Sequence, residues 1–277
     1  MAMSSGLLDR YFGRIGYAGS PAADLRTLQE LHRLHLQCIP YENIDVFCHR
    51  RIPLDRDALT GKMLRRRRGG YCFEQNGLFC AALTDLGFAC RPNMARFHYR
   101  RPKPGGRTHH VNLVEIEGRV WLCDVGFGGS GFSLPLALEP DAEVEQLGEI
   151  YRLRESDEHG FYLERKAGEE WQPLYTFKVD PALPIDLEMA NFCTANSSDH
   201  PFRDSVRGTR MTARGRVTLL DHTFRIHDLV TGTLETIVVT EFQRYIECLR
   251  TQLGVELNES ETARLEHRFP ELKPSAP

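Results

Sequence analysis

The segment Arg68-Gly69-Gly70-Tyr71-Cys72-Phe73-Glu74-Gln75-Asn76 places a cysteine where a Gly-Gly turn leads into a helix. Apolar side chains recur at helical spacing from 72 to 86, and Gly87 is a typical helix stop. Free backbone N–H groups and the helix dipole stabilise an anion at the first turn. We therefore expect Cys72 to be a thiolate nucleophile, although this segment alone also fits a buried structural cysteine.

A histidine on a predicted strand is the second part of the pattern. In the segment 108–112, apolar and polar residues alternate as in a half-buried strand. His109 lies on the same side as Val111 and Leu113, whereas His110 points to the opposite face. Only one of the two can face a given nucleophile, and His109 is the better candidate to take the thiol proton. A core histidine with a satisfied hydrogen bond is the alternative.

An aspartate ends the next predicted strand. Val120, Leu122 and Asp124 alternate on one side, and Glu117-Gly118 between the two strands is typical of a hairpin turn. A carboxylate on an apolar face is costly unless it is paired, and orienting an imidazole would supply the pairing. The alternative is an aspartate that only caps the turn Gly126-Phe127-Gly128-Gly129, which lacks the dinucleotide-binding pattern Gly-x-Gly-x-x-Gly.

The rest of the chain changes from helical to strand periodicity. Helices are predicted over 24–36, with Asp24 as N-cap, and over 55–67 and 72–86, whereas strands dominate from about residue 90. The turn-rich segment 191–203 is interpreted as a linker, and further strands and two helices follow it. The basic run 65–68 is interpreted as the solvated end of a helix.

The composition excludes several classes of protein. The chain has 277 residues (31.7 kDa), 35 Lys plus Arg against 38 Asp plus Glu, and a mean hydropathy of -0.39. We expect no nucleic-acid partner, no membrane span and no secretory signal, since neither a basic excess nor a long apolar run is present. The eight cysteines include no Cys-x-x-Cys pair, so we expect no metal site and reduced thiols, as in the cytoplasm.

Taken together, these segments resemble those of the arylamine N-acetyltransferases. The resemblance rests on the Cys72 segment, on Thr108-His109 and on Asp124-Val125-Gly126-Phe127-Gly128-Gly129. Three more blocks extend it along the chain: Tyr11-Phe12-Gly13-Arg14-Ile15-Gly16-Tyr17, Ile39-Pro40-Tyr41-Glu42-Asn43-Ile44-Asp45 and Leu253-Gly254-Val255-Glu256-Leu257. The family spacing of fifteen residues between histidine and aspartate selects His109, in agreement with the strand argument.

The resemblance implies an α+β fold in three domains. These are a helical bundle with the cysteine (1–90), an antiparallel β-barrel with the histidine and aspartate plus a linker (91–200), and a C-terminal α/β lid (201–277). The catalytic core would be similar to that of transglutaminases and papain-like cysteine proteases. Cys72, His109 and Asp124 would carry a ping-pong reaction from acetyl-CoA to an arylamine or arylhydrazine, or to the oxygen of an N-hydroxyarylamine. No metal is implied.

The resemblance also implies binding positions. Gly126, Phe127 and Gly128 correspond to the family's loop at the mouth of the cleft, which meets the pantetheine of coenzyme A and the acceptor ring. Gly105, Gly106 and Thr108 correspond to the segment before the histidine that contacts the phosphates.

The acceptor side is implied to be aromatic. Its residues are Tyr41, where the family usually has Phe, Phe97, Phe127 and, as a residue of the lid, Phe202. Ordinary core packing is the alternative for each ring. Glu42 is expected to be buried and to pair with Arg68.

Three other readings stay open at this stage. An amide synthase that closes a macrolactam would use the same triad with an acyl group bound to a carrier protein. A thiol hydrolase would resolve the acyl-enzyme with water instead of an amine. A non-enzymatic scaffold would hold an inert Cys72. For an enzyme, we expect a monomer or homodimer of bacterial type, with a small aromatic amine or hydrazine as the acceptor.

Overall fold

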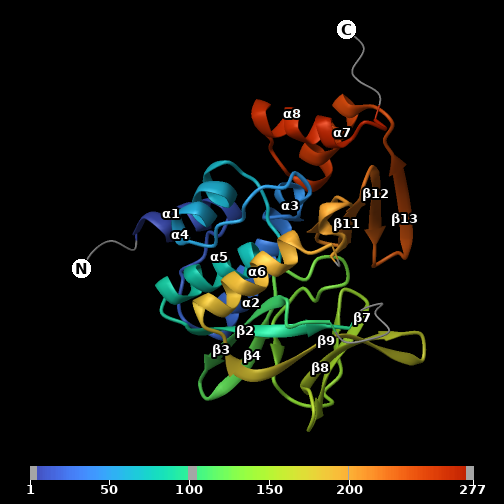
Figure 1. Cartoon of the computed structure of the whole chain (residues 1–277). Helices are drawn as coiled ribbons and strands as arrows, with labels where there is room; N and C mark the ends of the chain where they lie inside the picture. Colours follow the sequence, from blue (N-terminus) through green and yellow to red (C-terminus); the bar gives the residue numbers. More distant parts are fainter. Residues whose placement is uncertain (1–4, 99–104, 199, 273–277) are drawn as a thin grey trace.

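The computed structural model describes residues 5–98, 105–198 and 200–272. Its fold is α+β, as expected, with helices, an eight-stranded antiparallel sheet and a five-stranded antiparallel sheet. Figure 1 shows the first helices on one side, the larger sheet below them and the last helices at the far end. No helix in the described parts is both long and apolar enough to cross a lipid bilayer.

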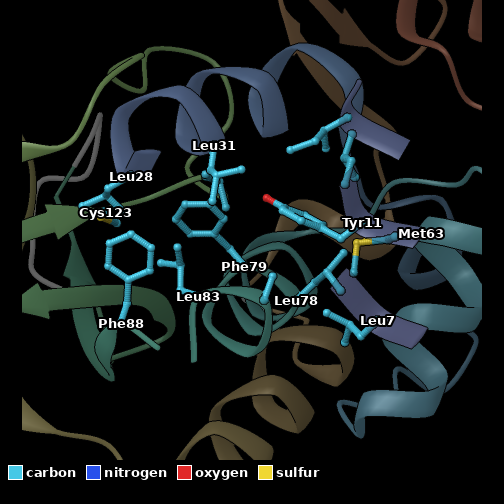
Figure 2. Close-up of a cluster of buried hydrophobic side chains, with 14 of the residues drawn as sticks. Leu7, Tyr11, Leu28, Leu31, Met63, Leu78, Phe79, Leu83, Phe88 and Cys123 are labelled. Atoms are coloured by element: carbon cyan, nitrogen blue, oxygen red, sulfur yellow. The ribbon is translucent and has the colours of Figure 1, made fainter. Parts of the chain in front are cut away.

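The first part of the chain forms a helical core. Its elements are α1 (Ser5–Ile15), α2 (Leu25–Cys38), β1 (Tyr41–Glu42), α3 (Ile44–Phe47), α4 (Arg56–Leu59), a π-helical turn (Thr60–Arg65) and α5 (Cys72–Asp85). Asp24 caps α2 as predicted, because its side chain accepts a hydrogen bond from the Thr27 N–H at 2.8 Å. Figure 2 shows Phe79 of α5 packed among Leu28, Leu31 and Tyr11, so α5 lies at the centre of this core.

The larger sheet curls into a nearly closed barrel. Its strands are β2 (Ala89–Phe97), β3 (His109–Ile116), β4 (Arg119–Cys123), β5 (Leu136–Ala137), β6 (Val144–Gln146), β7 (Glu149–Ser156), β8 (Gly160–Ala167) and β9 (Glu170–Pro181), in the spatial order β5-β4-β3-β2-β9-β8-β7-β6. A bridge between Pro140 and Leu153 brings the chain beyond β5 back to β7. The predicted hairpin between β3 and β4 is confirmed, with Glu117 and Gly118 both at positive φ.

The second sheet joins a short strand of the helical part to four strands that follow the barrel. Its strands are β10 (Arg207–Met211), β11 (Gly215–Leu220), β12 (Thr223–Asp228) and β13 (Thr233–Val238), and β1 from the helical part is its edge strand beside β10. The helices α7 (Phe242–Cys248), with a π-helical turn at Leu249–Leu253, and α8 (Glu259–Arg268) pack beside it (Figure 1). The division into domains at residues 90 and 200 stays a prediction.

The interpretation of 191–203 as a linker was wrong for most of that segment. Helix α6 (Pro184–Asn196) extends into it, and a short 3-10 turn follows at Pro201–Arg203. The polar residue Asn191 faces inward, where it accepts a hydrogen bond from the Tyr71 hydroxyl and donates one to the Ile52 carbonyl at 2.8 Å. Asn191 is polar because it makes buried hydrogen bonds, and the sequence pattern does not distinguish such a residue from one in a turn.

The basic run 65–68 also differs from its interpretation at one position. Arg65, Arg66 and Arg67 are exposed, but Arg68 is fully buried in an ionic cluster. Its Nη2 lies 2.8 Å from Glu42 Oε1, which confirms the expected pair.

The ionic cluster lies under the start of α5. Arg68 Nη1 is 2.9 Å from Glu261 Oε1, and Lys62 Nζ is 2.8 Å from both Asp45 and Glu74. Burial alone would lower the pKa of Lys62, but the facing carboxylates raise it. The cluster therefore keeps its charges inside the fold.

A buried histidine connects three helices of the core. The Tyr11 hydroxyl of α1 donates to His35 Nδ1 at 2.9 Å, and His35 Nε2 donates to Gln75 Oε1 of α5 at 2.6 Å. This pattern needs a neutral ring, and burial lowers the pKa of His35 to about 3.

The His35 side chain is expected to make the fold acid-sensitive. Because its pKa is lower in the folded than in the unfolded chain, its contribution is complete above about pH 6.5 and falls towards pH 3, by up to about 1.4 kcal/mol per pH unit. In His35→Gln, which can still donate and accept, stability between pH 7.5 and pH 5 is expected to fall by about 2 kcal/mol less than in the parent. Urea unfolding at the two pH values measures this difference; equal losses would contradict the assignment.

Candidate active site

The three residues predicted to act together do meet. Cys72 is the first residue of α5, His109 the first residue of β3, and Asp124 follows β4 directly. His109 Nε2 donates to Asp124 Oδ2 at 2.7 Å, and the Cys72 side chain forms a hydrogen bond with His109. Because Nε2 of the His109 ring is bonded to Asp124, Nδ1 is the ring nitrogen left to face Cys72. The exposed fractions are 5%, 2% and 1%, so water has little access to this chain of groups.

The electrostatics keep the imidazole charged. Burial alone would lower the pKa of His109, but Asp124 and then Cys72 raise it to about 10. Burial likewise favours a neutral Asp124, but the charge of His109, and then the hydrogen bonds from His109 and Asn76, hold the pKa of that carboxyl below its usual value. At neutral pH His109 is therefore an imidazolium beside the Cys72 sulfur, and this pair suits attack on a carbonyl followed by delivery of a proton.

Asn76 holds the aspartate and was missed by sequence reasoning. Its Nδ2 donates to Asp124 Oδ1 at 2.9 Å and to the His110 carbonyl at 2.7 Å, and its Oδ1 accepts from the Val125 N–H at 3.0 Å. The sequence feature that could have identified Asn76 is its position one helical turn after Cys72, since residues at i and i+4 share a face of a helix.

A second buried residue outside the prediction supports Asp124 from α2. His32 Nε2 accepts from the Asp124 N–H at 3.2 Å, and His32 Nδ1 donates to the Ser133 carbonyl at 3.0 Å. Accepting at one nitrogen requires a neutral ring, and burial lowers the pKa of His32 to about 4. Nothing in the sequence placed α2 behind the aspartate.

Tyr175 of β9 approaches the same carboxylate. Its side chain is fully buried, and its ring centre lies 5.2 Å from that of His109. Burial, and then the nearby charge of Asp124, raise the pKa of Tyr175 well above the usual value.

Gly126 lets the loop after Asp124 reach α5. A Cβ at this position would lie 2.7 Å from Cys72 Cα, so any side chain would push the loop and the helix apart. The Gly126 N–H donates to Asp124 Oδ1 at 2.9 Å. The absence of a side chain at Gly126 is therefore a packing requirement of the fold. Its role in ligand binding stays a prediction.

The aromatic residues expected at the acceptor side gather beside the triad. Phe97 and Phe127 stack at 5.1 Å and both meet His109 edge-on, at 5.6 and 5.8 Å. Tyr41 lies against Gly128, and a small cavity of about 10 Å³ is lined by Tyr41, Phe127 and Gly128 among others. This space holds about one water molecule.

Phe202 lies in the apolar cluster around Cys72. It packs in the cluster that contains Cys72 and Phe73, and meets the Tyr71 ring edge-on at 6.3 Å. All four predicted acceptor residues therefore surround the triad, although packing alone would also explain their positions.

The segment before His109 is a short turn. The Thr108 N–H donates to the Gly106 carbonyl at 3.0 Å, and the Gly105 carbonyl accepts from the Arg96 guanidinium. No group of three or more metal-ligating side chains occurs within 5–98, 105–198 and 200–272.

Known proteins are similar to this chain in sequence over most of its length. A family model described as N-acetyltransferase matches residues 24–262. Arylamine N-acetyltransferase of Escherichia coli K12 is 37% identical over 79% of this chain and 78% of its own length. The arylamine N-acetyltransferase / N-hydroxyarylamine O-acetyltransferase of Salmonella typhimurium is 34% identical over 97% of this chain and 94% of its own.

The chain belongs to the arylamine N-acetyltransferase family.

Solved structures of this family agree with the fold. The Salmonella typhimurium enzyme matches with a TM-score of 0.89 and 32% identity, over 95% of this chain and 99% of that one. The Mycobacterium marinum enzyme in complex with CoA matches with a TM-score of 0.87 and 29% identity, over 96% and 99%. As a member of an acyltransferase family, the chain is an enzyme, and the inert-scaffold reading is set aside.

Asn76→Ala is expected to lower the rate of acetyl transfer by about 10- to 100-fold, because Asp124 loses a hydrogen bond and the His110 carbonyl and Val125 N–H are left unpaired. Steady-state kinetics with acetyl-CoA and a simple arylamine measure the loss.

Asn112→Ala is the matched control for that variant. The buried Asn112 donates to the Asn76 carbonyl at 2.9 Å and, within the described residues, its side chain makes no hydrogen bond to Cys72, His109 or Asp124. We expect it to lower stability by about 1–3 kcal/mol while it retains most activity. Equal loss of activity in both variants would mean that Asn76 acts only through stability.

Proposed function

We propose that this chain transfers the acetyl group of acetyl-CoA to the nitrogen of an arylamine or arylhydrazine, and to the oxygen of an N-hydroxyarylamine, through acetyl-Cys72. The observation that carries the proposal is the buried Cys72–His109–Asp124 chain of hydrogen bonds in a member of this family. A positioned thiolate next to a proton carrier is what acyl transfer through a covalent intermediate requires.

In the first half-reaction, the Cys72 sulfur attacks the thioester carbonyl of acetyl-CoA. The bond between that carbonyl carbon and the coenzyme sulfur breaks, and the proton on His109 Nδ1 passes to the departing thiolate. Asp124 keeps the proton on Nε2 and so leaves Nδ1 to face the reacting atoms.

In the second half-reaction, the acceptor nitrogen attacks the carbonyl of acetyl-Cys72. His109 is now neutral and takes a proton from the amine as the carbon–sulfur bond breaks, which restores the starting ion pair. Asn76 and His32 act by positioning Asp124.

Burial favours transfer over hydrolysis. Tyr71, Phe73 and Phe202 pack around Cys72 and keep its surroundings apolar, so an aromatic amine competes well with water. The amide-synthase alternative differs in its donor, since it needs an acyl group on a carrier protein in place of acetyl-CoA.

Binding positions follow the same proposal. Gly126, Phe127 and Gly128 would meet the pantetheine, and Gly105, Gly106 and Thr108 the phosphates. Tyr41, Phe97, Phe127 and Phe202 would contact the acceptor, supported by their places around the triad. The eight cysteines are free, which suits an enzyme of the reducing cytoplasm. The proposal also includes a monomer or homodimer as the active form.

Incubation with acetyl-CoA and no acceptor is expected to add one acetyl group to Cys72, and a chase with an arylamine should remove it and yield the N-acetyl product. Intact-protein mass spectrometry measures both steps. Acetylation that decays equally fast without amine would indicate a hydrolase. No acetylation, with Cys72 still quickly alkylated, would indicate a carrier-bound donor.

Two substitutions test the roles of the reacting groups. Cys72→Ser is expected to abolish transfer with the fold intact, and Asp124→Asn to lower the rate by up to about 10⁴-fold through the wrong tautomer of His109. Circular dichroism checks the fold of each variant. More than a trace of transfer by Cys72→Ser would overturn the acyl-enzyme mechanism.

The pH dependence of alkylation tests the ion pair. The proposed ion pair, with the pKa of His109 raised to about 10, predicts that the rate of Cys72 alkylation by iodoacetamide varies less than about threefold between pH 6.5 and 9. An ordinary thiol would react roughly 70-fold faster at the upper value. His109→Gln is expected to restore that steep rise, and a steep rise in the parent would rule out the ion pair.

A further inference from the structure

Two cysteines that the proposed function does not use lie in contact. Cys80 is on α5, two turns beyond Cys72, and Cys90 is the second residue of β2. The Cys90 thiol points at Cys80 Sγ with a sulfur–sulfur distance of 3.0 Å. Both side chains are partly exposed, so a small reagent in solution reaches them.

This pair differs from the other thiols within the described residues. Cys123 and Cys248 are fully buried, and Cys193 lies exposed on α6. Two unbonded thiols usually keep a van der Waals separation of well over 3 Å, whereas the two sulfurs of a disulfide lie about 2.05 Å apart. At this site only a small approach of the two sulfurs separates the dithiol from a bonded pair.

We propose that Cys80 and Cys90 form a reversible disulfide, made by a two-electron oxidant such as hydrogen peroxide, that fastens α5 to β2. Cys80 sulfur attacks one peroxide oxygen, the O–O bond breaks, and a sulfenic acid and one water result. Cys90 sulfur then attacks Cys80 sulfur, the S–O bond breaks, and the second water leaves. In sum, two thiols and one peroxide give one disulfide and two waters.

The order of attack follows from the hydrogen bond. The Cys90 thiol donates to Cys80, which lowers the pKa of Cys80 and raises that of Cys90. Cys80 is therefore the sulfur that reacts first with peroxide, and Cys90 resolves the sulfenic acid.

The disulfide would connect two elements that support the catalytic residues. Helix α5 carries Cys72 and Asn76, and β2 pairs with β3, which carries His109. A bond from Cys80 to Cys90 would therefore join the helix of the nucleophile to the sheet of the histidine. It closes a short loop, which restricts the unfolded chain, and should raise the melting temperature by about 5 °C.

Peptide mapping tests the bond itself. Trypsin does not cleave Arg91–Pro92, so residues 69–96 form one peptide that holds Cys72, Cys80 and Cys90. In a Cys72→Ala host, treatment with peroxide and then iodoacetamide should leave this peptide two hydrogens lighter and without alkyl groups. Fragment ions from cleavage between residues 80 and 90 should be missing until a reductant is added.

Two single variants are the controls. Cys80→Ser and Cys90→Ser in the same host should each show no loss of two hydrogens, and their melting temperatures should not rise with peroxide. If the Cys72→Ala host does not fold, the parent serves, because fragments between 72 and 80 distinguish a ring that includes Cys72.

Several results would overturn the proposal. They are two alkyl groups on the peptide after peroxide treatment, a sulfinic acid at Cys80 instead of a bond, a cross-link to the peptide of Cys123, or an oxidised form that melts no higher than the reduced one.

Discussion

Two cations are buried under the first turn of α5, and each needs carboxylates that arrive from elsewhere in the chain. Arg68 and Lys62 are held by Glu42, Asp45, Glu74 and Glu261, which come from β1, α3, α5 and α8. Losing one partner leaves a buried charge uncompensated, which typically costs about 3–5 kcal/mol. The cluster thus fixes the Gly-Gly turn, and with it the direction from which Cys72 enters its helix.

Asp124 is the second point on which the site depends. It receives hydrogen bonds from a strand residue, His109, and a helix residue, Asn76, while its own N–H reaches His32 on α2. The carboxylate therefore sets the distance between the barrel and the helical core. The hydrogen bonds of Asp124 therefore orient the His109 imidazole and at the same time hold the barrel against the helical core.

The triad could be predicted because strand alternation and helix starts are local signals. His109 and Asp124 lie on the same face of adjacent strands, although β3 is buried on both faces, and Cys72 starts a helix after two glycines. Asn76 and Tyr175 were missed, because their roles depend on which elements pack together. Arg68 is buried beside three exposed arginines. Only its expected pairing with Glu42 indicated this, because a run of like charges does not show which residue points into the fold.

The pairing of β1 with β10, and of Arg68 with Glu261, has a consequence for biosynthesis. A ribosome adds about 5–20 residues each second, so roughly 190 residues and about 10–40 seconds separate Arg68 from its last carboxylate. During that interval the nascent helices present an unsatisfied guanidinium and an open strand edge. The helical part that carries Cys72 therefore completes this ionic cluster only once Glu261 has been synthesised, and until then it is a natural client for a chaperone.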